Sequence, residues 1–173
     1  MNWFFITFGY SGLSPKAPGT AGSFVALIVG IVFLLYFDAQ SLFLLSILTT
    51  LIAVKEINKY EQLSGIHDDK RIVIDEAVGM WLALSIAPAI SVTPPEVLEW
   101  QNGFIIQALL SFAFFRYFDI KKPSLIGRID REAKGGVGVV FDDVLAGIAG
   151  GICAALVWEF VLSPALLYLY LNF

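Results

Sequence analysis

The stretch VLAGIAGGICAALVWEFVL, residues 144–162, decides the fold class of this chain. It carries one charged side chain, Glu159, and is long enough to cross a bilayer as a helix, which takes roughly 17–25 apolar residues. Four further apolar stretches precede it: Ala21–Phe37, Ser41–Val54, Ala77–Val92 and Gly103–Phe118. The second crosses a bilayer only if its helix continues through Lys55 and Glu56. The pattern predicts an all-α, polytopic membrane helical bundle with four to five spans. A bundle of three or four spans with re-entrant pieces, and a buried soluble helical bundle, are the alternatives.

The composition supports a membrane protein. Apolar residues make up 58% of the 173 residues and charged residues 15%, whereas soluble domains average about 45–50% and about 25%. The length fits a single domain over residues 1–173. The net charge of -4 argues against a nucleic-acid partner, which would favour a basic surface. One cysteine, Cys153, excludes an intramolecular disulfide.

The first residues, MNWFFITF, lack the basic segment and the cleavage site of a secretory signal. Aromatic side chains concentrate where a bilayer meets water. This segment is therefore predicted to lie at the membrane interface.

Positive charge alternates along the connections between the apolar stretches. Lys and Arg occur before the first stretch, between the second and third, and between the fourth and fifth. These residues are Lys16, then Lys55, Lys59, Lys70 and Arg71, then Lys121, Lys122, Arg128, Arg131 and Lys134. The connections 38–40 and 93–102 contain neither. The positive-inside rule predicts that the N-terminus and both basic loops face the cytoplasm.

Two pairs of adjacent acids lie at stretch boundaries on this same side. Asp75 and Glu76 precede one apolar run, and Asp142 and Asp143 precede another. An acid at a helix N-terminus can simply complement the helix dipole, by about 0.3–1 kcal/mol. Two adjacent acids repel each other unless a cation lies between them, and carboxylate oxygens suit Mg²⁺. The four acids are therefore candidate metal ligands, and both pairs are expected to open their helices.

The segment FRYFDIKKP, residues 115–123, adds a third polar group. Arg116 and Asp119 are three residues apart and would share a helix face, as a local ion pair or as a phosphate contact and a metal ligand. Lys122 is a further candidate for phosphate binding. His67 lies in a polar loop, where a lone histidine is usually solvated, but its nearness to Asp75 makes it a candidate proton donor or ligand.

Two glycine-containing segments lead into apolar stretches on the same side. Gly135, Gly136 and Gly138 are expected to bring backbone N–H groups close to a ligand. Residues 11–23, SGLSPKAPGTAGS, form either an ordinary helix start or an anion cradle at a helix N-terminus. The candidate phosphate-binding residues of this segment are Pro18, Gly19, Thr20 and Gly22. Farther along, Gly147 and Gly151 form a GxxxG face that predicts close helix packing.

Four blocks of sequence, in order, resemble the bacterial phosphatidylglycerophosphatase A family. They are GLSPKAPGTAGS (12–23), HDDKRIVIDEAVGMW (67–81), FRYFDIKKP (115–123) and GGVGVVFDDVLAG (135–147). One departure is visible: Ser124 and Leu125 follow Pro123, where the family often has Trp-Pro. The resemblance implies a multi-pass enzyme of the bacterial inner membrane. It would hydrolyse the terminal phosphomonoester of phosphatidylglycerophosphate with Mg²⁺ as cofactor, in phospholipid biosynthesis.

The residues fit this implied reaction. One or two Mg²⁺ ions would be held by these five carboxylates: Asp75, Glu76, Asp119, Asp142 and Asp143. Asp75 or Glu76 would accept the proton of the attacking water, and His67 or a metal-bound water would protonate the leaving oxygen. Arg116, Lys122 and the Gly19–Gly22 backbone would hold the phosphate.

Two other classes fit less well. A transferase for nucleotide-linked headgroups would show an Asp-Gly start with spaced aspartates on one helix. A small cation or phosphate transporter would carry ionisable groups near the bilayer midplane and repeated halves. The sequence has neither pattern.

Overall fold

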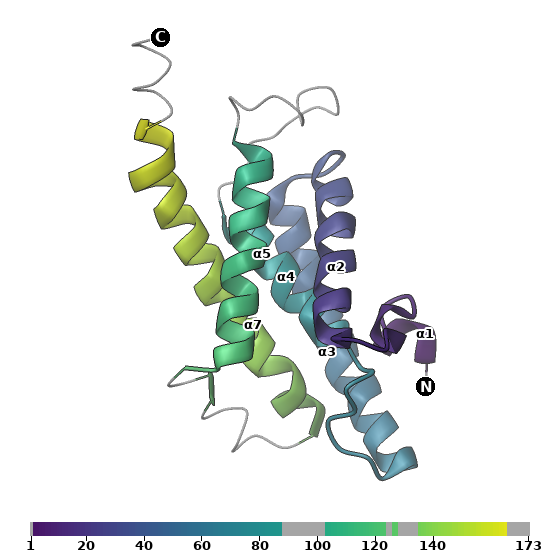
Figure 1. Ribbon diagram of the computed structural model, residues 1–173. Coiled ribbons are helices and arrows are strands. Elements are labelled where there is room, and N and C mark those ends of the chain that lie inside the picture. Colours follow the sequence, from purple (N-terminus) through teal and green to yellow (C-terminus); the bar gives the residue numbers. More distant parts are fainter. Residues whose placement is uncertain (1, 88–102, 124–125, 128–134, 166–173) are drawn as a thin grey trace.

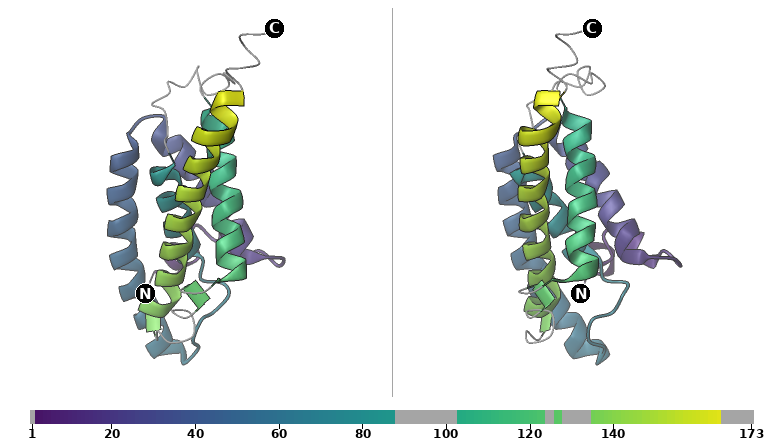
Figure 2. Two further views of the ribbon diagram at one scale, coloured as in Figure 1. Left: turned by 90° about the vertical axis from the view of Figure 1, so that its left-hand side faces the viewer. Right: turned by 60° about the vertical axis from the view of Figure 1, so that its left-hand side comes forward.

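The computed structural model describes residues 2–87, 103–123, 126–127 and 135–165. Over these residues the chain is all-α, as predicted, and contains no strand. Its α-helices are α1 (Trp3–Ile6), α2 (Pro18–Leu34), α3 (Ala39–Ser64), α4 (Ile74–Ile86), α5 (Phe104–Lys121) and α7 (Gly135–Val157) (Figure 1). A 3₁₀ turn covers Ser11–Leu13, and Trp158–Leu162 is π-helical. The long helices α3, α5 and α7 run along the length of the bundle (Figure 2).

The short helix α4 forms the core of the bundle. It contacts α2, α3, α5 and α7, and all its residues from Ile74 to Leu84 except Glu76 are buried. A helix that is apolar on every side needs neighbours all around it. Its 13 residues span about 20 Å, less than the predicted stretch Ala77–Val92. The helix ends at Ile86 because Ala87 takes an extended conformation before Pro88; residues 88–92 lie outside the described ranges.

Two of the described helical segments are long and apolar enough to cross a membrane: Ala39–Ser64, and Gly135–Ala165, which contains α7. The predicted four to five spans are therefore not confirmed. Helix α3 continues through Lys55 and Glu56 and exceeds the predicted stretch Ser41–Val54 by ten residues at its C-terminal end.

The outward faces of α2 and α3 are apolar. Phe24 and Val32 on α2, and Leu44, Leu48 and Leu51 on α3, are all exposed. Contiguous exposed apolar surface of this kind is uncommon on soluble monomers and suits contact with lipid.

Glycines bring α7 into backbone contact with α4 and α5. A side chain at Gly147 would meet the backbone of Gly79 on α4. One at Gly150 would lie 2.7 Å from the backbone nitrogen of Phe115 on α5. The prediction of a close-packing glycine face is confirmed, and its partners are helices of the same chain.

The N-terminal segment packs against the loop that precedes α4. The backbone N–H of Val73 donates to the carbonyl oxygen of Ile6 at 3.0 Å. The guanidinium of Arg71 lies 5.1 Å from the ring centre of Trp3, within the range of a cation–π contact. The predicted location of this segment at the membrane interface stays a prediction.

The same loop is anchored by Asp69. Its carboxylate accepts hydrogen bonds from Arg71 Nη2 at 2.6 Å and from the hydroxyl of Tyr60 at 2.5 Å. The guanidinium of Arg71 holds the pKa of the Asp69 carboxyl well below its usual value. The loop is thus tied to α3 through Tyr60 and to α1 through Trp3.

Replacing Asp69 by Asn is expected to destabilise the protein by about 1 kcal/mol at pH 7, because Arg71 is half exposed and the pair is screened by water. The pKa of Asp69 is lowered in the folded state, so its contribution exists above the unfolded pKa of about 3.9 and declines as the pH falls below it. Thermal unfolding of purified protein between pH 7 and pH 3 measures this. The control is Asp68→Asn, since the Asp68 carboxylate has no ion-pair partner among the described residues. Equal melting temperatures of Asp69→Asn and wild type at pH 7 would contradict the prediction.

Candidate active site

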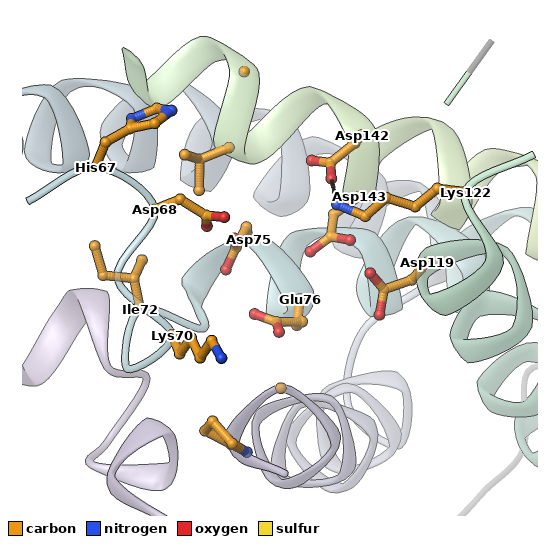
Figure 3. A pocket seen from close by; sticks show the side chains of 14 residues that line it. His67, Asp68, Lys70, Ile72, Asp75, Glu76, Asp119, Lys122, Asp142 and Asp143 are labelled. Atoms are coloured by element: carbon orange, nitrogen blue, oxygen red, sulfur yellow. Dashed lines mark hydrogen bonds and ion pairs between the residues drawn. The ribbon is translucent and has the colours of Figure 1, made fainter. Parts of the chain in front are cut away.

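A polar pocket of about 290 Å³ opens at the end of the bundle where α2, α4 and α7 begin and α5 ends (Figures 1 and 3). The loop between α3 and α4 forms one of its walls. The pocket is lined by Pro18, Gly19, His67, Asp68, Lys70, Ile72, Asp75, Glu76, Asp119, Lys122, Gly138, Val139, Asp142 and Asp143. The sequence segments singled out as polar therefore meet in one place, as predicted.

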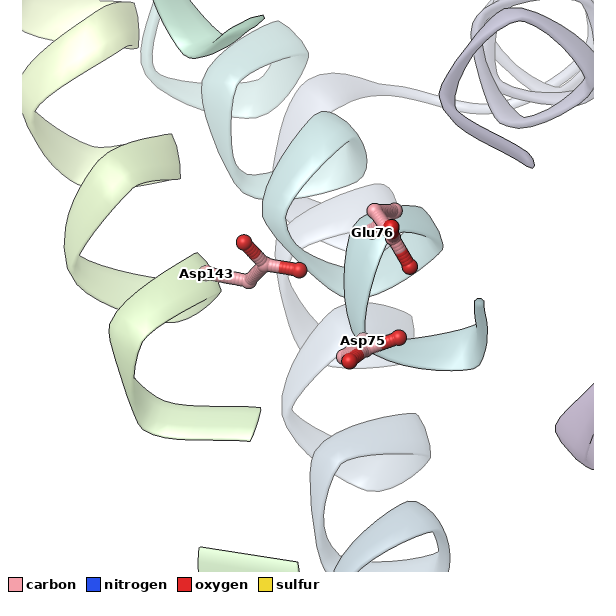
Figure 4. A group of neighbouring side chains, drawn as sticks. All are labelled: Asp75, Glu76 and Asp143. Atoms are coloured by element: carbon pink, nitrogen blue, oxygen red, sulfur yellow. The ribbon is translucent and has the colours of Figure 1, made fainter. Parts of the chain in front are cut away.

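Three carboxylates converge at the centre of this pocket (Figure 4). Asp75 and Glu76 lie in the first turn of α4, as predicted, and Asp143 reaches toward them from α7. One carboxylate oxygen from each of these three residues lies within 4.8 Å of the corresponding oxygens of the other two. The approach depends on Gly79, where a side chain would lie 2.6 Å from the carbonyl oxygen of Asp143.

The three acids, Asp75, Glu76 and Asp143, have the properties of a divalent-cation site. Asp75 and Asp143 are 8% and 4% exposed. Asp75 Oδ1 and Glu76 Oε2 are buried and accept no hydrogen bond from the described residues. Buried carboxylate oxygens without donors are costly unless a cation satisfies them. The residues present therefore fit a hard divalent cation such as Mg²⁺.

The other two predicted metal ligands are paired with cations. Asp119 forms an ion pair with Arg116 one helical turn earlier on α5, which confirms that they share a face. Asp142 accepts a hydrogen bond from Lys122 Nζ at 2.7 Å. Of the five acids, the structure thus brings three together and pairs two with basic residues, Arg116 on α5 and Lys122 directly after it.

The position of Asp142 and Asp143 within their helix corrects the prediction. They were expected to open an apolar helix, but α7 begins at Gly135, so both acids lie about two turns inside it. Gly136 packs against α3, where a side chain would lie 2.5 Å from the carbonyl oxygen of Val54. Close helix packing therefore accounts for this glycine, while Gly138 lines the pocket.

The N-terminus of α2 forms the wall opposite α7. Gly19 has no room for a side chain, because a Cβ there would overlap Glu76 Oε1 and lie 3.6 Å from Arg116 Nη1. Arg116 also donates to the hydroxyls of Thr20 at 3.3 Å and Ser23 at 3.1 Å. The first backbone N–H groups of a helix have no helical partner and favour anions.

The predicted phosphate-binding residues of α2 differ in where they lie relative to the pocket. Pro18 and Gly19 line the pocket, whereas Thr20 and Arg116 do not. The two residues contact each other, and Arg116 reaches the lining residue Asp119. Gly22 packs against Val73, where a Cβ would be 2.7 Å from the Val73 Cβ, and does not line the pocket.

His67 lies at the rim of the pocket. Its side chain is 60% exposed, and its Nδ1 is 2.5 Å from Glu61 Oε1 at the end of α3. Glu61 was not singled out from the sequence, because its contact with the loop depends on α3 continuing to Ser64.

Lys70 also lines the pocket and was not predicted as a site residue. In the sequence it belongs to a run of charged residues that resembles a solvated loop. Lys70 faces the pocket because of the turn at residues 69–72, which the backbone N–H of Ile72 closes onto the carbonyl oxygen of Asp69, and no motif in the sequence marked that turn.

The fold and the pocket define a class: a helical bundle with two segments long and apolar enough to cross a membrane, and a carboxylate-rich pocket at one end. A protein-family model described as phosphatidylglycerophosphatase A matches residues 4–158. The chain belongs to this family, and its relatives in the family are named as phosphatases.

Individual relatives agree with the family. Phosphatidylglycerophosphatase A of Haemophilus influenzae is 36% identical over 80% of this chain and 77% of its own length. Phosphatidylglycerophosphatase A of Escherichia coli K12 is 34% identical over 84% of this chain and 77% of its own. A protein of Bacteroides thetaiotaomicron, named provisionally as a phosphatidylinositol-3-phosphatase, is 41% identical over 84% of this chain and 86% of its own. No solved structure matches the chain significantly.

Proposed function

We propose that this enzyme removes the terminal phosphate of phosphatidylglycerophosphate and releases phosphatidylglycerol, a step of phospholipid biosynthesis. The observation that carries the proposal is the cluster of Asp75, Glu76 and Asp143, which lies in one pocket with Lys122. The named activity of the H. influenzae and E. coli relatives supports this substrate.

The proposed cofactor is Mg²⁺, held by Asp75, Glu76 and Asp143. Two observations support at least one bound cation: oxygens of the three carboxylates lie within 4.8 Å of one another, and Asp75 Oδ1 and Glu76 Oε2 are buried without a hydrogen-bond partner among the described residues. When bound, the ion supplies charge neutralisation for the phosphoryl oxygens and makes a water molecule more acidic.

The remaining residues bind the phosphate and move protons. Arg116, Lys122 and the first N–H groups of α2 hold the phosphoryl oxygens. Asp75 or Glu76 takes a proton from the water whose oxygen attacks phosphorus. The bond between phosphorus and the glycerol oxygen breaks, and that oxygen receives a proton from His67, whose orientation is held by Glu61.

We place the pocket on the cytoplasmic side of the bacterial inner membrane, in a multi-pass bundle. The basic residues Lys70 and Lys122 lie at the pocket, and the connection 38–40 at the opposite end of α3 carries no Lys or Arg. This asymmetry follows the positive-inside rule. Helices α2 and α5, of 17 and 18 residues, are candidates to bring the number of spans to four, the lower end of the predicted range.

A second substrate is phosphatidylinositol 3-phosphate, which the name of the B. thetaiotaomicron relative suggests. Both lipids carry a phosphomonoester on a polyol headgroup that a phosphodiester joins to diacylglycerol. The same carboxylate and cation groups can serve either one, so the two substrates are compared directly.

The test measures phosphate release from each lipid in detergent micelles, with Mg²⁺ and with excess chelator. Release from phosphatidylglycerophosphate is expected with Mg²⁺, and a loss of more than about 100-fold with chelator, because the phosphoryl charge is then left uncompensated. Higher kcat/KM for the inositol lipid would replace the proposed substrate by the second one. Undiminished release in chelator would contradict the Mg²⁺ proposal.

A further inference from the structure

The loop before α4 presents alternate side chains to opposite sides. Every second residue lines the pocket: Asp68, Lys70 and Ile72. The residues between them, Asp69 and Arg71, pair with each other and contact α3 and α1. Residues 69–72 form a turn that the backbone N–H of Ile72 closes by donating to the carbonyl oxygen of Asp69 at 2.8 Å. Within this turn Asp69 and Arg71 pair with each other, and Lys70 between them lines the pocket.

Lys70 differs from the other basic side chains at this site. Lys122 donates to Asp142, Arg116 pairs with Asp119, and His67 contacts Glu61. Lys70, by contrast, has no hydrogen bond or ion pair with any other residue that the structure describes. Its positive charge therefore remains free to bind an anion that enters the pocket.

The two lysines of the pocket, Lys70 and Lys122, lie on different sides of the acids. Figure 3 shows Lys122 beside Asp142, and Lys70 across the pocket from it, with Asp75 and Glu76 between them. A phosphate bound at the acids beside Lys122 would leave Lys70, on the other side of Asp75 and Glu76, available for a second anionic group of the same headgroup.

We propose that Lys70 binds the phosphodiester of the lipid headgroup. It would thereby select lipids in which a phosphodiester separates the phosphomonoester from diacylglycerol. This inference rests on the proposed function and names a specificity-determining residue for it. A lysine serves as a point charge for a phosphate group, and a diester retains one negative charge throughout the reaction. Lys70 therefore contributes equally to substrate and transition-state binding, which changes KM and leaves kcat unchanged.

The experiment compares Lys70→Gln with Lys59→Gln, which removes the same charge from an exposed position on α3 that does not line the pocket. Wild-type phosphate release from phosphatidylglycerophosphate is measured first; its absence would refute the proposed function itself. For each variant, KM, kcat and the inhibition constants of two products are then determined. Phosphatidylglycerol retains only the diester, and inorganic phosphate reports only on the site of the monoester.

Lys70→Gln is expected to raise KM and the inhibition constant of phosphatidylglycerol together by about tenfold or more, as for the loss of one hydrogen bond to a charged group. The kcat and the inhibition constant of inorganic phosphate should not change. Lys70→Arg should restore both values, and Lys59→Gln should match wild type.

Two results would overturn the inference while leaving the proposed function intact. Weaker inhibition by inorganic phosphate, with unchanged inhibition by phosphatidylglycerol, would assign Lys70 to the reacting phosphate. Unchanged constants for both products would show that Lys70 binds neither group. Lys70→Glu provides a second variant, since its repulsion of the diester should raise KM further than Lys70→Gln does.

Discussion

Replacing Asp143 by Asn is expected to lower kcat by more than about 100-fold. Mutating residues that only hydrogen-bond to a metal ligand already costs about 10–100-fold in metal affinity or activity, and Asp143 is a proposed ligand itself. Asp143 supplies one of three carboxylates that converge within 4.8 Å. The amide has nearly the same shape but no charge, so the remaining pair, Asp75 and Glu76, binds a divalent cation more weakly. Phosphate release over a series of Mg²⁺ concentrations measures both the loss and the higher Mg²⁺ requirement.

A second readout for Asp143 does not depend on turnover. Mg²⁺ should raise the melting temperature of the wild-type protein, since a ligand that binds the folded state stabilises it, and should do so much less in Asp143→Asn. Asp38→Asn is the control, because Asp38 caps α3 through Ser41 and does not line the pocket. Near wild-type activity of Asp143→Asn at the same Mg²⁺ concentration would remove Asp143 from the site.

Replacing Gly147 by Leu is expected to reduce both stability and activity. The first side-chain atom at this position would overlap the backbone of Gly79, and backbone cannot move aside as a flexible side chain can. Overpacking of this kind costs about 1–3 kcal/mol or more. Relief requires α7 to shift away from α4, which separates Asp143 from Asp75 and Glu76. We therefore expect a lower melting temperature and a fall in kcat of more than about tenfold.

The control for Gly147 is Ala155→Leu on the same helical segment. Ala155 lines an open apolar groove with Ile152 and Leu156, so a larger side chain has room there. This variant should retain the wild-type melting temperature and kcat. If Gly147→Leu also retained both, the close contact between α7 and α4 would not be what positions the acids.

Several features followed from local pattern. The apolar composition required helices, because a helix satisfies its own backbone hydrogen bonds in an apolar medium. Asp75 and Glu76 do open α4, and Arg116 and Asp119 do share a face. The glycine face of α7 does pack closely. In each case the relation joins residues within a few positions of one another, where helical geometry alone determines the neighbours.

Helix ends were less predictable because packing moves them. Gly135, Gly136 and Gly138 were expected to precede the helix that Asp142 and Asp143 open, and glycine disfavours helix interiors by about 1 kcal/mol. In the structure this segment is the start of α7, where Gly136 allows a close approach to α3. Contact with a helix far away in the sequence outweighs the local preference.

The sequence by itself determined the family, the helical class and the set of ionisable residues that meet at one end of the bundle. Only the tertiary structure decided which of those residues form the carboxylate cluster and which pair with a basic side chain. Asp143 joins Asp75 and Glu76, whereas Asp142, its neighbour in the chain, pairs with Lys122. Adjacent residues on a helix point about 100° apart, so which of them faces the centre depends on how α7 is rotated against α4. That rotation is set by glycine contacts between separate helices, which no local pattern encodes.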